Sequence, residues 1–386
     1  MRRALGAGVV AVVLTFGSLV GLAGPAGAAP VSYTDRGARE VLRRPATVTE
    51  VRLDLAASSV QVDASQSAPG EVPIGSYRFD FGDGTVLTQS SAIASHRYAQ
   101  PGEYNVVTTA VGTDGQSSDR RDFVTVLPFV STVALLSLEN LRYVEYVPDK
   151  FRASQLGVTP EGQFDIVGGG SGQVALVSRG SGKYLTVSSQ WIAIDSRFTY
   201  AGVSERFTLV RNADGSISLR SAENDHYVGV LEAQSPTLYP AYPSITRLAK
   251  FHEVRAGDQA RTLKAYANGK FVSAESAGVK PLIASRPAAN NWERFDIVEL
   301  GNGQVALFAR ANNQFVAAEQ AGAQPLQAKR VAVSGWERFT LVRNTDGSVS
   351  LKAAVNNKYV AAEAAGAQPL LAGRTAIGTW ERFTLG

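Results

Sequence analysis

The stretch AAEQAGAQPLQAKR at residues 317–330, followed by GWERF at 335–339, decides the fold of this chain. Forty-four residues later the chain repeats it as AAEAAGAQPLLAGR at 361–374 and TWERF at 379–383. A less similar copy ends in NWERF at 291–295. A pattern that returns at a fixed interval of this size indicates one supersecondary unit used several times.

The same spacing of about 44 residues continues toward the N-terminus. There only the aromatic residues recur at it, because the rest of the pattern has changed. One phenylalanine stands near the end of each unit, and successive ones are 43 or 44 residues apart: Phe164, Phe207, Phe251, Phe295, Phe339 and Phe383. A second aromatic residue keeps nearly the same spacing: Tyr143, Tyr184, Tyr227, Phe271, Phe315 and Tyr359. The region from about residue 131 onward therefore contains six units.

Each unit has the pattern of short β-strands. Residues 349–353 alternate apolar and polar side chains, as a half-buried strand does. Turn signals separate such runs at Asn268-Gly269, Asn302-Gly303, Asp214-Gly215 and Asp346-Gly347. Because no stretch has helical periodicity, we predict an all-β chain with about four short strands in each unit.

The six units form two sets of three. The last three share a glutamate, a proline, an arginine and a tryptophan: Glu275, Glu319 and Glu363; Pro281, Pro325 and Pro369; Arg286, Arg330 and Arg374; Trp292, Trp336 and Trp380. The first three units lack the tryptophan and most of the rest. We therefore predict two modules, 131–255 and 260–386.

Three copies of four short strands can close into a barrel, which removes exposed sheet edges. That architecture is the β-trefoil, and two tandem β-trefoils are the interpretation that the break after the third unit favours. The alternative is a propeller of six blades, whose blades usually share one pattern throughout.

The repeated stretches at 318–326 and 335–339 resemble the fascin-like β-trefoil domain. The resemblance covers all of 260–386, and it covers 131–255 only through spacing and aromatic residues, so the first module is a degenerate copy. Bacterial versions of this domain occur as accessory carbohydrate-binding modules. The Gln-x-Trp motif of ricin-type sugar-binding trefoils is missing, so no sugar-binding residue of that family is transferred to this chain.

Residues 49–127 have a different pattern, with alternating apolar and polar residues and frequent turn signals, which suits a small β-sandwich. Within it stand FDFGDG at 79–84, HRY at 96–98 and PGEY at 101–104. Their order and spacing are similar to the PKD domain, an immunoglobulin-like sandwich. Such domains usually act as spacers or interaction modules.

The N-terminus has the form of a secretory signal peptide over residues 1–28. Arg2 and Arg3 precede an apolar run, and Ala26-Gly27-Ala28 forms a small-residue cleavage site. The alternative is an uncleaved membrane anchor, but no charged stop-transfer cluster follows. We expect a secreted, extracellular chain that has no membrane segment after cleavage, with residues 29–48 as a flexible lead-in. The absence of cysteine means that packed cores must stabilise it.

Charge and motifs argue against several classes of function. The net charge is +4, with Lys and Arg scattered, so no nucleic-acid partner is expected. The three histidines, His96, His226 and His252, fit no catalytic or metal-binding motif. Asp80 and Asp83 lie in a turn, where carboxylates cap backbone N–H groups; a bound cation is the alternative. We expect no enzyme activity, catalytic residue, metal or cofactor.

The three tryptophans allow two interpretations. They are either exposed platforms on which sugar rings stack or bulky residues of the barrel core. The core interpretation is favoured because each one begins a WERF-type run that enters a strand, and aromatic residues dominate cores. It predicts that Trp336→Ala lowers stability by about 3–5 kcal/mol.

The repeated polar residues are the candidate ligand-binding set: Asn268, Glu275, Arg286, Asn312, Glu319, Arg330, Asn356, Glu363 and Arg374. The alternative is that each Glu–Arg pair is a structural ion pair. Three shallow sites on one barrel would suit multivalent capture of a polysaccharide. We therefore expect a non-catalytic carbohydrate-binding protein; the alternative is a protein-interaction or cell-surface scaffold protein with extracellular protein partners.

Overall fold

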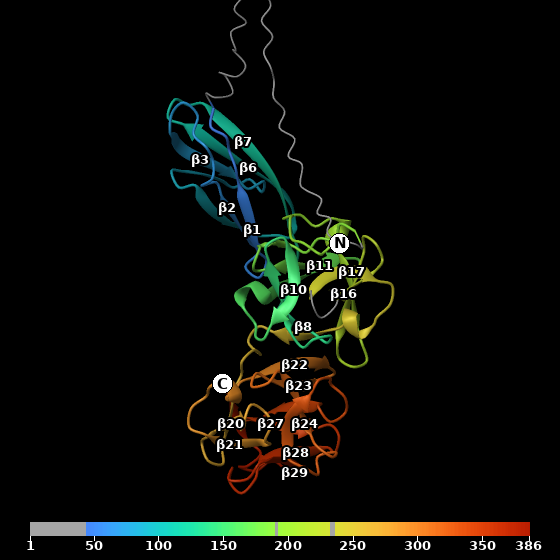
Figure 1. The fold of residues 1–386 in the computed structure, drawn as a ribbon. Coiled ribbons are helices and arrows are strands. Elements are labelled where there is room, and N and C mark those ends of the chain that lie inside the picture. The colour runs from blue at the N-terminus through green and yellow to red at the C-terminus, as the bar shows by residue number, and fades with distance from the viewer. Residues whose placement is uncertain (1–43, 190–191, 232–235) are drawn as a thin grey trace, which may run out of the picture. The chain divides into compact units, whose positions relative to one another are not determined.

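The structure, a computed structural model, describes residues 44–189, 192–231 and 236–386 (Figure 1). The predicted signal peptide and residues 29–43 of the predicted lead-in lie outside this described part. Across it the chain forms thirty strands and four 3-10 turns but no α-helix, which confirms the all-β prediction. No helix among the described residues is both long and apolar enough to cross a membrane.

The N-terminal region consists of two antiparallel sheets. The three-stranded sheet has the order β1-β2-β5, with β1 (Glu50–Asp54), β2 (Ser59–Asp63) and β5 (Ile93–Arg97). The four-stranded sheet has the order β4-β3-β6-β7, with β3 (Ile74–Asp80), β4 (Val86–Gln89), β6 (Gly102–Gly112) and β7 (Ser117–Val126). Alternate side chains of both sheets, among them Val62, Phe79 and Val106, are buried in one cluster. This is the core that the alternating pattern predicts.

The first set of three units, here called the first ring, contains strands β8 to β18. They are β8 (Phe129–Ser137), β9 (Tyr143–Val147), β10 (Lys150–Gln155), β11 (Gln163–Gly170), β12 (Gln173–Ser178), β13 (Lys183–Tyr184), β14 (Phe207–Arg211), β15 (Ile217–Ser221), β16 (Tyr227–Leu231), β17 (Thr237–Tyr242) and β18 (Phe251–Arg255). The last strand returns to the first, since β18 pairs with β8 from Phe251↔Ser137 to Arg255↔Val133. Three of the repeated phenylalanines, Phe164, Phe207 and Phe251, are buried in its core.

The second set, here called the second ring, contains strands β19 to β30. They are β19 (Leu263–Ala265), β20 (Phe271–Ala274), β21 (Leu282–Arg286), β22 (Phe295–Gly301), β23 (Gln304–Ala309), β24 (Gln314–Ala318), β25 (Leu326–Arg330), β26 (Phe339–Arg343), β27 (Val349–Ala353), β28 (Lys358–Ala362), β29 (Leu370–Arg374) and β30 (Phe383–Leu385). It also closes on itself, because β19 pairs with β30.

The strands of both rings belong to one hydrogen-bonded closed-barrel network. The four 3-10 turns, η1 (Pro160–Gly162), η2 (Val203–Glu205), η3 (Arg247–Ala249) and η4 (Asn291–Glu293), each lie just before the strand that carries a repeated phenylalanine. The second ring buries Phe295, Phe339 and Phe383 together with leucine, valine and alanine side chains. The repeat that the sequence analysis identified is thus a repeat of core positions.

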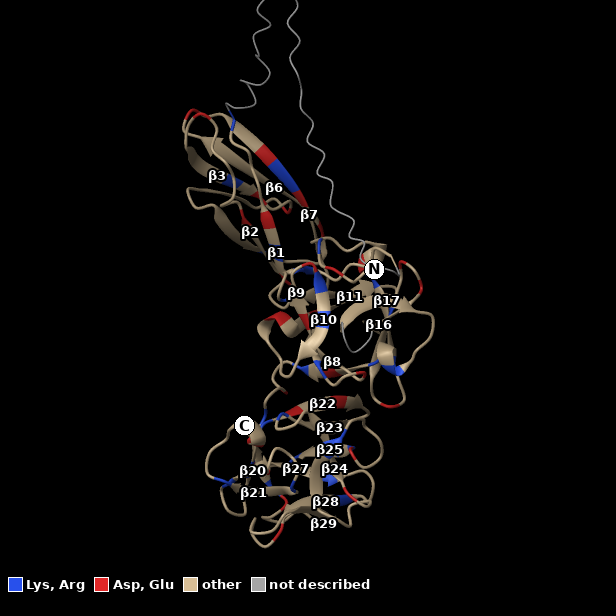
Figure 2. Ribbon diagram, in the orientation of Figure 1, with Lys and Arg blue, Asp and Glu red and all other residues tan. Residues whose placement is uncertain are grey.

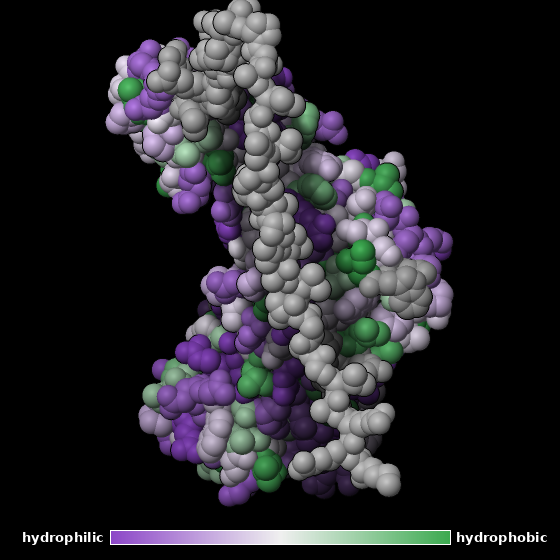
Figure 3. Space-filling view, turned by 45° about the horizontal axis from the view of Figure 1, so that its top comes forward, coloured by the Kyte–Doolittle hydropathy of each residue, from purple (hydrophilic) through white to green (hydrophobic). Residues whose placement is uncertain are grey.

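The surface has neither a single sign of charge nor one large apolar face in the views drawn. Figure 2 shows acidic and basic residues interspersed along the strands. Figure 3 shows hydrophobic residues as small separate patches among hydrophilic ones on the visible face.

Candidate ligand-binding site

All three predicted Glu–Arg pairs are formed in the second ring. Each glutamate follows the first strand of a hairpin (β20, β24 or β28), and each arginine ends the second strand (β21, β25 or β29). The Arg330 guanidinium donates from Nε to Glu319 Oε1 at 3.1 Å and from Nη2 to Oε2 at 2.9 Å. Arg374 also uses two nitrogens toward Glu363, with Nε 3.0 Å from Oε1. The sequence spacing of 11 residues therefore closes a hairpin with an ion pair.

The pair of the fourth unit is held differently. Arg286 Nη2 lies 2.7 Å from Glu275 Oε2, and Ser285 Oγ donates to Oε1 of the same carboxylate at 2.6 Å. Burial by itself would raise the pKa of Glu275, but the hydrogen bonds from Ser285 and Arg286 outweigh it and lower the pKa. This carboxylate is therefore ionised over the physiological pH range.

Each arginine also lies over the ring of its own tryptophan. The distance from the Arg Cζ to the ring centroid is 5.9 Å for Trp292, 5.2 Å for Trp336 and 5.3 Å for Trp380. Trp292 is 38% exposed and the other two are half-buried. The prediction that the tryptophans fill the core is wrong, because the core positions belong to the phenylalanines three residues further on.

A short turn before each phenylalanine places the glutamate of the motif inside and the tryptophan outside, which is the opposite of the predicted arrangement. In the fourth unit this turn is η4 (Asn291–Glu293), and the glutamate after Trp292 points inward, with Glu293 Oε2 accepting the N–H of Asn290 at 2.8 Å. Glu337 and Glu381 do the same for the N–H groups of Ser334 and Gly378. A capped turn therefore buries the glutamate and turns the tryptophan toward solvent.

The three asparagines of the predicted set make structural contacts. The Nδ2 atoms of Asn268, Asn312 and Asn356 donate at 2.8 Å to the carbonyls of Ala284, Ala328 and Ala372 respectively. Each also lies directly against a turn glycine of the preceding unit in the ring: Gly366, Gly278 and Gly322 respectively. The asparagines thus link each unit to its neighbour around a closed cycle of three.

The turns that follow the glutamates have a strained backbone, which the sequence analysis missed. Residues 276–278, 320–322 and 364–366 all have positive φ, for example 50° at Ala364 and 54° at Ala365. Left-handed conformations cost about 1–2 kcal/mol for each residue other than glycine. Strain of this kind is often kept where a backbone must present a site.

A depression of about 450 Å³ opens beside the Glu–Arg pair of the sixth unit. Its lining combines residues of the fifth and sixth units: Ala323, Pro325, Glu363, Gln368, Pro369, Leu371, Gly373 and Arg374. Glu363 and Arg374 belong to the predicted set. Gln368, Leu371 and Gly373 were missed. Gly373 differs from its counterparts in both other units of the ring, whereas Leu371 stands where unit five has Gln327 and unit four has the aliphatic Ile283.

The histidines and turn carboxylates have structural surroundings. His96 stacks on Phe81 with ring centroids 4.5 Å apart, and its Nε2 is 2.7 Å from Asp83 Oδ2. Asp80 and Asp83 accept the N–H groups of Gly82 and Thr85, as predicted for turn caps. Among the described residues, no group of three His, Cys, Asp or Glu side chains is placed to hold a metal ion.

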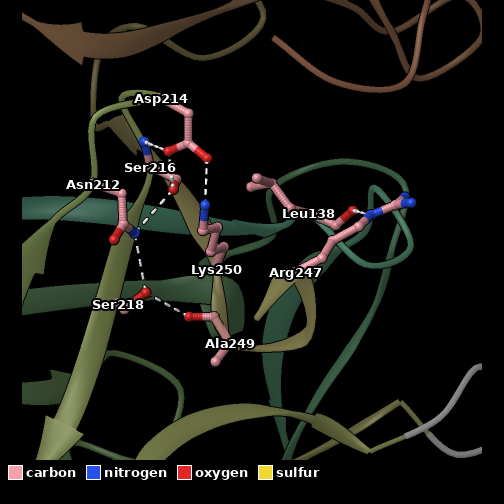
Figure 4. Close-up of polar contacts among 8 residues, drawn as sticks. All are labelled: Leu138, Asn212, Asp214, Ser216, Ser218, Arg247, Ala249 and Lys250. Atoms are coloured by element: carbon pink, nitrogen blue, oxygen red, sulfur yellow. Dashed lines mark hydrogen bonds and ion pairs between the residues drawn. The ribbon is translucent and has the colours of Figure 1, made fainter. Parts of the chain in front are cut away.

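A polar cluster of the first ring is likewise structural. Figure 4 shows Asp214 accepting from Lys250, with Nζ 2.6 Å from Oδ2, beside Asn212, which donates to Ser216 and Ser218. The same turn chemistry recurs in the second ring at 344–350, where Asn344 donates to two serines. Nearby, Arg247 Nε donates to the carbonyl of Leu138 at 2.8 Å.

Asp214→Asn should reduce stability at neutral pH but not in strong acid. Burial alone would raise the pKa of Asp214, but hydrogen bonds from Lys250 and Ser216 lower it to about 2. The ionised pair therefore stabilises the fold above the unfolded pKa of 3.8, and this contribution is lost as the pH falls toward 2. Urea unfolding should show a loss of about 1 kcal/mol at pH 7, since the pair is partly exposed. An equal loss at pH 2 and pH 7 would contradict this assignment.

The N-terminal region of the chain matches a known domain family. Residues 44–126 match the sequence profile of the PKD domain family, as the sequence analysis predicted for 49–127. The match includes residues 44–48 of the predicted lead-in. This segment is tied to the domain, because the Ala46 N–H donates to the Ala68 carbonyl at 2.9 Å. The PKD1 domain of the Vibrio cholerae metalloprotease PrtV has 28% identity over 21% of this chain and 96% of its own, with a TM-score of 0.19.

Two other solved structures are similar to parts of the chain. The designed threefold-symmetric protein ThreeFoil has 20% identity over 32% of this chain and 96% of its own, with a TM-score of 0.31. The hemolytic lectin CEL-III has 12% identity over 67% of this chain and 64% of its own, with a TM-score of 0.37. No curated protein matches the chain.

Proposed function

We propose that this chain is a secreted, non-catalytic carbohydrate-binding protein whose second ring presents the ligand site. One observation carries the proposal: the surface of the second ring holds three Glu–Arg–Trp sets, each with an arginine between a carboxylate and an indole face. The carboxylate accepts hydrogen bonds from sugar hydroxyls, the guanidinium donates them, and the half-exposed indole offers an apolar face.

The finer architecture belongs to the same proposal. The two sheets of the N-terminal region form an immunoglobulin-like β-sandwich of the PKD type, and each ring is a β-trefoil. Supporting the latter, each ring contains three units and pairs its last strand with its first. The PKD-like domain then serves as a spacer, and the first ring is a degenerate copy that lacks the Glu–Arg–Trp sets.

The ion pairs are compatible with a binding role. Arg286, Arg330 and Arg374 are each about two-fifths exposed, at 43%, 38% and 45%, so a ligand can reach each guanidinium, while the paired glutamates keep 18%, 9% and 18% of their side chains exposed. Pre-arranged polar groups lower the entropic cost of fixing side chains when a ligand binds.

Retention of the purified chain on insoluble polysaccharides tests the proposal. Cellulose, chitin and insoluble β-1,3-glucan should be offered in parallel, and at least one should remove the chain from solution. A soluble fragment of that polysaccharide should release it, and no reducing sugar should appear over time. Failure to bind any glycan, together with saturable binding to an extracellular protein, would instead favour the scaffold alternative.

A further inference from the structure

The three Glu–Arg–Trp sets share a backbone but differ at the position before the arginine. Units four, five and six have Ser285, Lys329 and Gly373 there. Ser285 Oγ lies 2.6 Å from Glu275 Oε1, and Lys329 Nζ lies 3.1 Å from Glu319 Oε2. A Cβ added at Gly373 would be 4.0 Å from Glu363 Oε1. The side chain that approaches the carboxylate in the other two units is therefore absent beside Glu363.

A second difference lies two residues earlier, where neighbouring units meet. Between units four and five, Gln327 Nε2 donates to the carbonyl of Val279, so this hydrogen bond links the two units. Between units five and six, Leu371 replaces the glutamine and Ala323 replaces the valine. Leucine has no donor, so the equivalent bridge cannot form here. Unit four also has an aliphatic residue, Ile283, at this position, so the bridge distinguishes unit five from the other two units.

Both differences act at the depression of the sixth unit. Its volume of about 450 Å³ falls within the range of about 300–1,000 Å³ that is usual for small-molecule sites. Pro325, Pro369 and Leu371 supply an apolar wall, while Glu363 and Arg374 supply an acceptor and a donor. The Glu363 carboxylate accepts one hydrogen bond on each oxygen, both from the Arg374 guanidinium, so each oxygen keeps a lone pair for a ligand.

We propose that this depression is the principal sugar subsite and that it takes one pyranose ring of a neutral oligosaccharide. The inference rests on the proposed carbohydrate-binding function and assigns that function to one of the three sets. The C–H face of the ring packs against the proline and leucine side chains, while adjacent hydroxyls bond Glu363 and Arg374. A neutral sugar fits because the ion pair has no net charge and therefore offers no net attraction to an anionic or a cationic sugar.

Calorimetric titration of the full chain with laminarihexaose, cellohexaose and maltohexaose tests the inference. The wild-type chain should bind one of them at one site per chain. Gly373→Lys copies the residue of unit five and should weaken binding at least tenfold. A Cβ at this position has its nearest neighbour, Leu371 Cδ2, at 3.4 Å, an ordinary van der Waals contact, so the variant should fold. Thr345→Lys adds the same charge to an exposed turn and should leave binding unchanged.

A gain-of-function variant covers the case in which Gly373→Lys does not fold. Gln327→Leu combined with Lys329→Gly gives unit five the residues of unit six and should raise the stoichiometry from one site to two. Wild-type affinity in Gly373→Lys, or a stoichiometry of one in the double variant, would overturn the inference but leave carbohydrate binding intact. Absence of heat from the wild-type chain with all three sugars would overturn the inference, and only if the chain also fails to be retained on every insoluble polysaccharide would the proposed function be contradicted as well.

Discussion

Phe339→Ala should lower the unfolding free energy of the second ring by about 3–5 kcal/mol, the usual result of removing a large buried aromatic side chain. Phe339 has no exposed surface and is part of the ring's central core cluster. Its backbone pairs with both Val305 and Ala353, so neighbouring strands limit how far the cavity can collapse. Urea unfolding followed by circular dichroism measures the change in the transition of this ring.

Trp336→Ala, three residues earlier, is the matched control. This side chain is half-buried, lies over the Arg330 guanidinium and is not part of the core cluster, so its loss should cost less, about 1–2 kcal/mol. The core interpretation of the sequence would give the two variants similar losses. A loss for Trp336→Ala as large as that for Phe339→Ala would therefore contradict the outward placement of the tryptophans.

Gly322→Ala should have the second large effect, about 2–4 kcal/mol, because backbone strain and overpacking act together. Gly322 has φ of +81°, and a Cβ there would overlap the amide of Asn356 in the next unit. That amide is itself fixed by its hydrogen bond to Ala372. The variant should show this loss in urea unfolding.

Gly303→Ala separates the two causes. Gly303 has φ of +72°, but a Cβ there would meet no atom within 4 Å. Its loss should therefore be limited to the backbone contribution of about 1–2 kcal/mol. Equal losses in the two variants would mean that contact between neighbouring units does not fix the position of Gly322.

The sequence predicted the period of the fold better than the direction of its side chains. Six phenylalanines at regular spacing revealed the period of the repeat, and the structure buries all six, whereas the prediction had placed the tryptophans in the core. The same spacing applies to Trp336, however, so periodicity alone cannot decide which of the two aromatic residues faces inward. The buried carboxylate of Glu337 decides it, and a charged residue in the middle of the motif gave no sign of burial.

Residues of the candidate site could be predicted where the same residue recurs in each unit, but not where the residue varies between units. Glu363 and Arg374 were found because their counterparts recur in each unit of the second ring. Leu371 and Gly373 escaped because a search for shared residues passes over those that vary. The left-handed turn at Ala364 was also invisible, since alanine has no preference for positive φ.

A glycan array should compare the full chain with a variant carrying Glu275→Gln, Glu319→Gln and Glu363→Gln, because it asks whether these carboxylates bind sugar. The amide keeps the shape of the carboxylate but loses its charge, so the arginines are no longer held and hydroxyl groups lose their strongest acceptor. We expect the unchanged chain to give a signal on neutral glycans, and the variant, with unchanged circular dichroism, to lose at least nine-tenths of that signal. Equal signals from both proteins would contradict a role for these carboxylates in binding sugar.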